Sequence, residues 1–334
     1  MIAAIKQAIL HILDASHQIP VISEREMEVD DAMINTYITR LIERIYDDSA
    51  HRNGEFMSNS GLKHHINEYK SGGENFIELS ANIANRLFDA LKNTEEPKPC
   101  DIVVCSVMIN ERDAIAILKL DNKTGITHRV EKDENGIFNN LINHYAILPA
   151  MTQKISEYAF IMLDDLSIRY RGGSYKIDGE KADLFADILL ECDYEISSRE
   201  AVNTVTRAAK RVTVENGGDM METAARMKEC VVESIDEGEN LDTAKIASHV
   251  FDGRPAMLGE FKAKMENANV PPQIEVNKYV TKKVTSDIKL ITDIGVELSF
   301  PAEYYNNSEY VDIINNDDGT ISIVIRNIGE LTNK

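Results

Sequence analysis

The sequence predicts an α+β fold: an N-terminal mixed domain with an antiparallel sheet and flanking helices, then a helical region and a small C-terminal antiparallel β-rich module. Three observations predict this order. Apolar residues recur every three to four positions between residues 31 and 91, and again between residues 179 and 267. Short apolar, β-branched runs bounded by turn residues occupy residues 100 to 170 and the segment after Pro272. Because the connections between these runs are short, we expect antiparallel strands.

The N-terminal part opens with two short apolar runs within residues 9 to 22, which predict a hairpin, with a helix as the alternative. Amphipathic helices are expected next, over residues 31 to 47, 62 to 69 and 76 to 91. Asp30 or Asp31 is suited to cap the first helix. Ser71 and Glu74 have the spacing of a capping box before the third.

Strand-like runs follow Cys100, at residues 102 to 109, 114 to 120, 126 to 130, 158 to 163 and 166 to 170. Turn chemistry between or after them comes from residues 122 to 125, Asn135-Gly136 and Gly172-Gly173. These runs supply the predicted antiparallel sheet.

The C-terminal part is first helical and then strand-like. Helices are expected at residues 180 to 191, 198 to 214, 220 to 235, 243 to 251 and 256 to 266. Gly217 and Gly238 are suited to end two of these helices, and Pro255 to begin the last. Strands are expected at residues 279 to 284, 288 to 291, 296 to 300, 310 to 314 and 321 to 325.

The chain length predicts two domains, because 334 residues exceed the size at which a single core usually stops growing. We place an N-terminal α+β domain at residues 1–193. A C-terminal domain at residues 194–334 holds helices to about residue 268 and then the β-rich segment.

The composition is that of a globular protein, with 43% apolar and 28% charged residues. Its four cysteines form neither a C-x-x-C pair nor a disulfide framework, which favours a reducing compartment. No signal peptide or membrane-spanning apolar run is found in the sequence. The expected location is therefore the cytoplasm.

The sequence offers no catalytic, cofactor-binding or metal-binding signature. His64, His65 and Glu68 resemble half of a metal site, but exposed polar residues on a short helix explain the spacing equally well. The glycine pairs do not form a phosphate-binding loop, and no nucleophile motif is present. We expect a non-enzymatic protein without a cofactor.

The charge balance is strongly acidic, with 36 basic and 56 acidic residues and a formal charge of −20. Such a chain is repelled by DNA phosphates unless its cations gather on one face. Three basic clusters are candidates for DNA binding: Arg207, Lys210 and Arg211; Lys278, Lys282, Lys283 and Lys289; and Arg169, Arg171 and Lys176. The alternative for each is a solvated face or a set of ion pairs.

Residues 243 to 266 have the connection length of a helix-turn-helix. Glu260 and Glu266 accompany Lys262 and Lys264 on the second helix, which makes it unsuited to reading a major groove. An ordinary packed helical hairpin is the preferred interpretation.

The order of elements resembles the 37 kDa nucleoid-associated proteins of bacteria over nearly the whole chain. The matching segments are residues 2 to 13, 158 to 185, 241 to 270 and 295 to 300 with the final hairpin. The resemblance implies localisation to the nucleoid and association with DNA, without a known enzymatic activity or cofactor.

Three hypotheses follow. The first is a nucleoid-associated protein that contacts the backbone of duplex DNA with little sequence preference, in which formation of a homodimer would double the cationic face. The second is an acidic adaptor that docks on a DNA-bound protein such as a topoisomerase. The third is a metal-dependent nuclease using Asp164, Asp165 and Asp178, for which turn residues are the simpler interpretation.

Overall fold

The computed structural model describes residues 2–14, 19–237, 240–276, 288–300, 304, 309–316 and 318–330. The chain divides into two compact units, Met1–Glu195 and Ile196–Lys334. The predicted α+β class is confirmed: an antiparallel sheet with flanking helices is followed by helices and then by small antiparallel sheets.

The first unit is built on a seven-stranded antiparallel sheet with the order β1-β3-β4-β7-β8-β2-β11. Its strands are β1 (Ile2–Leu13), β2 (Arg52–Phe56), β3 (Cys100–Ile109), β4 (Arg112–Asp121), β7 (Glu157–Met162), β8 (Ile168–Arg171) and β11 (Cys192–Tyr194). The hairpin between β3 and β4 turns at Asn110 and Glu111, whose φ angles of 48° and 65° match a two-residue primed turn.

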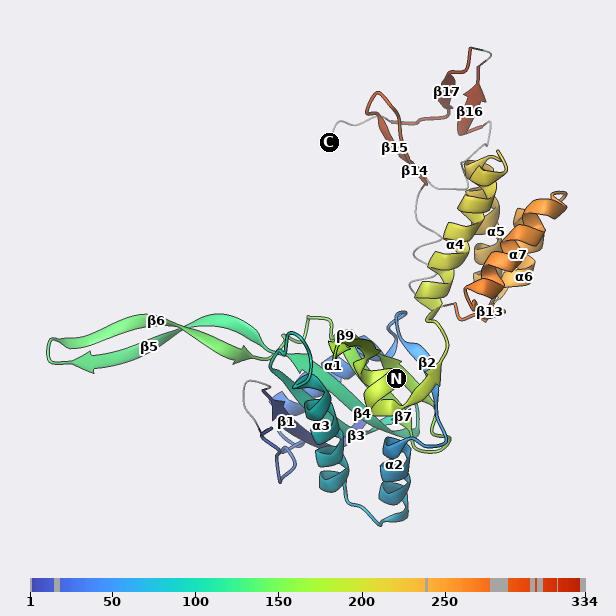
Figure 1. The fold of residues 1–334 in the computed structure, drawn as a ribbon. Helices are drawn as coiled ribbons and strands as arrows, with labels where there is room; N and C mark the ends of the chain where they lie inside the picture. The colour runs from blue at the N-terminus through green and yellow to red at the C-terminus, as the bar shows by residue number, and fades with distance from the viewer. Residues whose placement is uncertain are drawn as a thin grey trace. The chain divides into compact units, whose positions relative to one another are not determined.

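Helices cover both faces of this sheet (Figure 1). α1 (Ala32–Tyr46) packs on one face against Leu118 and Phe160. α2 (Gly61–Ser71), α3 (Phe76–Leu91) and the π-helix η1 (Leu184–Leu190) pack on the other, against Ile115 and Ile117. Because neighbouring residues of β4 point to opposite buried faces, its central run from Ala114 to Leu118 is apolar without alternation.

Two further strand pairs belong to the first unit. β9 (Ser174–Ile177) pairs with β10 (Glu180–Asp183), and β5 (Lys123–Asp133) pairs with β6 (Gly136–Ile147). The β5–β6 pair forms a long ribbon that leaves the sheet where β4 ends (Figure 1).

Several predicted elements of this unit differ from the structure. The first run of the predicted opening hairpin belongs to a longer strand, β1, and the second run pairs with it only through the antiparallel bridge between Val21 and Ile12. The predicted helix at residues 180 to 191 is divided into β10 and η1. The capping box before α3 is formed by Asn75 and Glu78, while Ser71 ends α2.

The second unit begins with four helices around one apolar core. They are α4 (Ser198–Glu215), α5 (Met220–Glu237), α6 (Thr243–Val250) and α7 (Pro255–Asn267). A short pair, β12 (Leu241–Asp242) and β13 (Gln273–Ile274), closes the group. The prediction that Pro255 opens the last helix is confirmed, and Gly217 follows α4 with a φ of +65°. Gly238 lies outside the described residues.

Within its described residues, the C-terminal β-rich segment contains two hairpins: β14 (Ile288–Ile291) with β15 (Glu297–Phe300), and β16 (Val311–Asn315) with β17 (Ile321–Ile325). These four strands confirm the predicted strands, and their ends lie within one residue of the predicted ends. The predicted strand at residues 279 to 284 lies outside the described residues.

The N-terminal cap of α1 supports a stability prediction. The Asp31 carboxylate accepts hydrogen bonds from the N–H groups of Met33 and Ile34 at 2.8 and 3.0 Å. Asp31→Ala removes this acceptor and is expected to lower the free energy of unfolding by about 1 kcal/mol, measured by urea denaturation. Asp30→Ala is the matched control, because that neighbouring carboxylate does not cap the helix. Equal losses in the two variants would contradict the assignment.

Candidate nucleic-acid interface

Helix α4 is positioned by its cap and its apolar side. Ser197 Oγ accepts a hydrogen bond from the N–H of Glu200 at 3.2 Å, and the Glu200 carboxylate accepts one from the N–H of Ser197 at 3.0 Å. This capping box fixes where the helix begins. Val205, Ala209 and Val212 are buried against the other helices of the unit. The small alanine allows close approach of its neighbours, so this side of α4 is held against the core.

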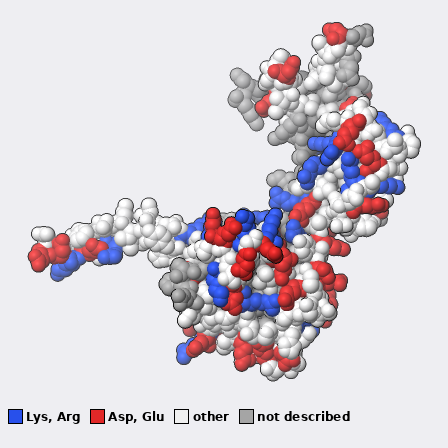
Figure 2. Space-filling model, viewed as in Figure 1, with Lys and Arg blue, Asp and Glu red and all other residues white. Residues whose placement is uncertain are grey.

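The first predicted basic cluster lies on the opposite side of α4. Arg207, Lys210 and Arg211 are all exposed, and their spacing of three and four residues places them on one stripe of the helix. On the face of the molecule shown in Figure 2, Lys and Arg are interspersed with Asp and Glu over the helices of this unit. The positive charge that the stripe presents therefore depends on which of its cations have acidic partners.

Arg211 is the member of the stripe that is neutralised. Its Nε donates to Glu215 at 2.7 Å, and Lys264 of α7 lies 3.2 Å from the same carboxylate. The hydrogen bonds from Arg211 and then Lys264 lower the pKa of Glu215 to about 2. Glu215 is thus ionised at neutral pH and offsets the charge of Arg211.

Arg207 and Lys210 carry no such partner. Among the described residues, neither cation lies within ion-pair distance of a carboxylate. They are separated by about 4.5 Å along the helix axis, and each strand of duplex DNA presents a phosphate about every 3.4 Å of its axis. Their long side chains can therefore contact neighbouring phosphates of one backbone.

The cluster of Arg169, Arg171 and Lys176 is divided by the fold. Arg169 and Arg171 alternate along β8 and so share one face of the sheet. The Arg169 guanidinium lies over the ring of Tyr46, 5.3 Å from its centroid, and Arg171 pairs with Asp48 at 3.2 Å. Both arginines are already engaged within the first unit.

Lys176 lies on the separate β9–β10 pair. Its Nζ is 3.2 Å from Glu95, and its surroundings include a pocket of about 510 Å³. The charged residues that line this pocket are Lys98, Lys119, Lys176, Glu95, Glu96 and Asp121. The acids balance the bases, and the structure does not bring Lys176 together with Arg169 and Arg171 into one basic surface.

The cluster of four lysines falls mostly outside the described residues. Lys278, Lys282 and Lys283 are not described, and Lys289 is described only as part of the backbone of β14. DNA binding by these four lysines stays a prediction.

The aspartates considered for nuclease chemistry occupy two turns. Asp164 and Asp165 both accept hydrogen bonds from Arg112, at 2.6 to 2.7 Å. The Arg112 hydrogen bond lowers the pKa of Asp164, and hydrogen bonds from Ser167 and then Arg112 lower that of Asp165. Asp178 lies apart, in the β9–β10 turn. In the part of the chain that the structure describes, no group of three or more His, Cys, Asp or Glu is placed to hold a metal ion.

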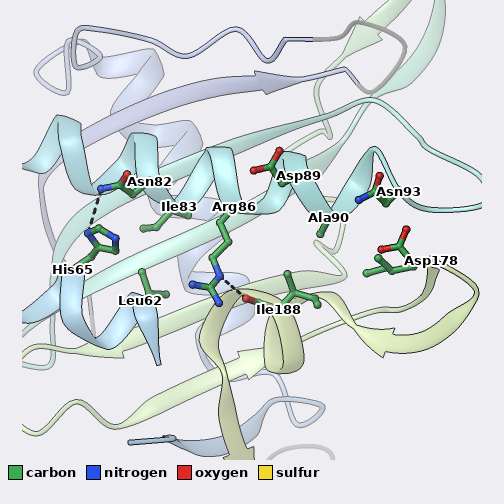
Figure 3. Close-up of a pocket in the computed structure, with 11 residues that line it drawn as sticks. Leu62, His65, Asn82, Ile83, Arg86, Asp89, Ala90, Asn93, Asp178 and Ile188 are labelled. Atoms are coloured by element: carbon green, nitrogen blue, oxygen red, sulfur yellow. Dashed lines mark hydrogen bonds between the residues drawn. The ribbon is translucent and has the colours of Figure 1, made fainter. Parts of the chain in front are cut away.

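A pocket of about 470 Å³ separates α2, α3 and η1 (Figure 3). Arg86 crosses it, with Nε donating to the carbonyl of Ile188 at 2.6 Å and Nη2 pairing with Glu191 at 2.5 Å. Asn82 Nδ2 lies 3.2 Å from His65 Nδ1 on its wall. These polar groups bind one another and join the helices, so we assign the pocket a structural role.

The sequence matches the family model described as nucleoid-associated protein YejK over residues 9–332. The chain belongs to this family. The resemblance to the nucleoid-associated proteins that was inferred from element order is thereby confirmed. Since the match spans both structural units, it includes α4 as well as the sheet. The search of curated proteins finds no match to this nucleoid-associated protein. Among the helices of the described residues, none has the length and apolar character needed to cross a bilayer.

Proposed function

We propose that this nucleoid-associated protein binds the phosphate backbone of duplex DNA with little sequence preference, and that α4 supplies its first contacts. One observation carries the proposal. Arg207 and Lys210 are exposed on the outer side of α4 without a carboxylate partner among the described residues, whereas Arg171, Lys176 and Arg211 are ion-paired.

The chemistry of these side chains favours phosphate over base recognition. Arg207 and Lys210 project from the middle of a helix rather than from its N-terminal turn, and α4 begins with Glu200 in its first turn. Phosphate contacts position a protein on DNA without reading sequence. Arg211 adds a contact wherever a phosphate replaces Glu215 as its partner. A homodimer would present the α4 cations twice.

This function requires no catalytic step, and we propose that the protein acts without a cofactor on the nucleoid, in the cytoplasm. Reversing the charge of Arg207, Lys210 and Arg211 together to Glu is the direct test. The variant is expected to bind labelled duplex DNA on the order of 10- to 100-fold more weakly at low salt. The slope of log affinity against log salt should decrease by roughly 0.9 for each phosphate that the variant no longer neutralises. Fluorescence anisotropy with an unrelated-sequence competitor measures both quantities.

A matched control separates the α4 stripe from overall charge. Changing Lys63, Lys70 and Lys181 to Glu alters the net charge equally, but on the first unit. This control variant should retain most of its DNA affinity. Unchanged binding by the α4 variant, or equal losses in the two variants, would remove α4 from the proposed interface.

The formal charge of −20 favours a second candidate, the acidic adaptor that docks on a DNA-bound protein. Pull-down from a nuclease-treated lysate distinguishes the two functions. A basic or topoisomerase-like partner retained after DNA removal supports docking, while a partner that disappears with the DNA supports direct binding.

A further inference from the structure

The β5–β6 ribbon has no packing partner within the described residues. Its two strands pair with each other as a separate sheet, and most of its side chains are exposed on both faces. A two-stranded ribbon is marginally stable in water on its own. In the described part of the chain, the ribbon is held at its base, where β4 runs directly into β5 (Figure 1). Its length and exposure suggest a surface that a partner covers.

One face of the ribbon is apolar. The register pairs His128 with Leu141 and Val130 with Asn139, so even-numbered residues of β5 share a face with odd-numbered residues of β6. This face carries Ile126, Val130, Ile137, Leu141 and Tyr145, each exposed by 62 to 73%. The five side chains alternate between the strands and lie within diagonal reach of one another. They form a continuous zigzag stripe, which we call the ribbon stripe.

The opposite face is more polar. Arg129 and Glu131 form an ion pair there at 2.5 Å, and Asn140 lies opposite Arg129. Phe138 shares this face, but it is less exposed than the members of the ribbon stripe, at 42%. An apolar partner therefore fits the ribbon stripe better than the opposite face.

Charge along the ribbon favours one kind of partner. Its outer end carries Glu131, Asp133 and Glu134 against Lys132 and Arg129, and Arg129 is already paired with Glu131. The inner part of both strands includes Lys123 and no acid, so the ribbon has a net negative charge toward its tip and a lysine at its base. DNA would meet the acidic tip and the apolar stripe unfavourably. A second ribbon in the antiparallel direction would place each acidic tip over the Lys123 of the other copy.

From these observations we propose that the ribbon stripe is a dimer interface, which packs face to face on the same stripe of a second copy of this chain related by a twofold axis. A twofold contact uses the same patch on both copies, which the zigzag pattern and the charge gradient both satisfy. The ends of a ribbon about 34 Å long are separated by more than a Debye length, so the gradient can set the direction of packing. This inference does not rest on the proposed DNA binding, since the ribbon and α4 belong to different units.

The size of the ribbon stripe sets the expected strength. A face about 34 Å long and roughly 10 Å wide covers about 340 Å² on each copy, less than the roughly 800 Å² per partner of a standard interface. The dimer should therefore be reversible, with a dissociation constant near the micromolar range. Sedimentation of the full chain over a series of concentrations should show a monomer–dimer equilibrium.

The test changes the two central apolar side chains to acids. Val130→Asp with Leu141→Asp is expected to raise the dimer dissociation constant on the order of 100-fold, because both are desolvated in the interface. Thr127→Asp with Asn140→Asp adds the same charge to the opposite face and should leave the constant nearly unchanged. Far-UV circular dichroism of both variants should match the parent, because the ribbon lies outside the buried core.

Cross-linking tests the direction of packing. The four native cysteines are buried, so an introduced thiol can be followed alone. His128→Cys lies on the ribbon stripe near its middle and should form a disulfide between two copies under mild oxidation. Asp133→Cys at the tip should not, because antiparallel packing separates the tips. A monomeric parent at every concentration, equal disruption by both double variants, or cross-linking at residue 133 instead of 128 would overturn the proposal.

Discussion

Lys119→Met is expected to lower the free energy of unfolding by about 3–5 kcal/mol, because it leaves the carboxylate of Glu157 buried without its cation. Lys119 Nζ lies 2.8 Å from Glu157 between β4 and β7, and the two side chains are only 4% and 6% exposed. Burial alone would lower the pKa of Lys119, but the charge of Glu157 raises it above its usual value. Lys119 is therefore charged in the folded protein. Urea denaturation of the parent and the variant measures the loss.

The double variant Lys119→Met with Glu157→Gln separates charge from packing. It removes both charges while keeping the approximate volume, and Tyr175, whose hydroxyl donates to Glu157 at 2.6 Å, retains an acceptor. Replacing both members of a buried pair is often close to neutral. The double variant should therefore recover most of the stability that Lys119→Met alone removes. A double variant as unstable as the single one would show that packing, not the unpaired carboxylate, dominates.

Helix α1 shows what local pattern can establish. Its apolar period and its cap at Asp31 are both properties of neighbouring residues, so its bounds could be predicted to within a residue. β10 shows the reverse. Its sequence, Glu-Lys-Ala-Asp, has little preference for a strand, and pairing with β9 imposes the extended conformation.

β6 was missed for a related reason. Only the turn at Asn135-Gly136 was recognised, because asparagines and a histidine interrupt the apolar alternation of residues 136 to 147. The strand is nevertheless formed by its register with β5. The apolar face of the ribbon is visible only once that register is known.

The candidate interface also has some features that neighbouring residues predict and others that depend on residues far apart in sequence. The stripe of Arg207, Lys210 and Arg211 could be predicted because helical spacing alone sets it, and the pairing of Arg211 with Glu215 follows the same rule at i,i+4. The partner of Arg171 could not, because Asp48 is 123 residues away in sequence. DNA binding by these clusters stays a prediction that the anisotropy measurements above would test.

Asp48 connects the end of α1 to the sheet. Its side chain is 5% exposed and accepts from Lys154 at 2.8 Å and from Arg171 at 3.2 Å. The hydroxyl of the buried Tyr158 donates to the same carboxylate at 3.2 Å, as does the N–H of Ala50. Asp48→Ala is expected to cost about 3 kcal/mol, because it leaves the Tyr158 hydroxyl buried without an acceptor and two cations without their shared anion.

The same network makes the free energy of unfolding depend on pH in the acidic range. Burial alone would raise the pKa of Asp48, but the hydrogen bond and charge of Lys154, with smaller contributions from Ala50 and Arg171, lower it below its usual value of 3.8. Because the folded pKa is the lower one, the carboxylate contributes its full stabilisation above pH 3.8. This stabilisation disappears as the pH falls from there through the folded pKa.

Asp48→Asn isolates this contribution to the acid response. The amide keeps an oxygen acceptor for Ala50 and Tyr158 but cannot titrate, so the variant should be less stable than the parent at neutral pH. Its deficit should shrink as the pH falls below about 4, because the parent then loses the charge that the variant already lacks. Thermal unfolding from neutral pH to the lowest pH at which the chain refolds measures this difference. A deficit that stays constant over that range would mean that Asp48 acts through its hydrogen-bond geometry, and that its charge contributes little to joining α1 to the sheet.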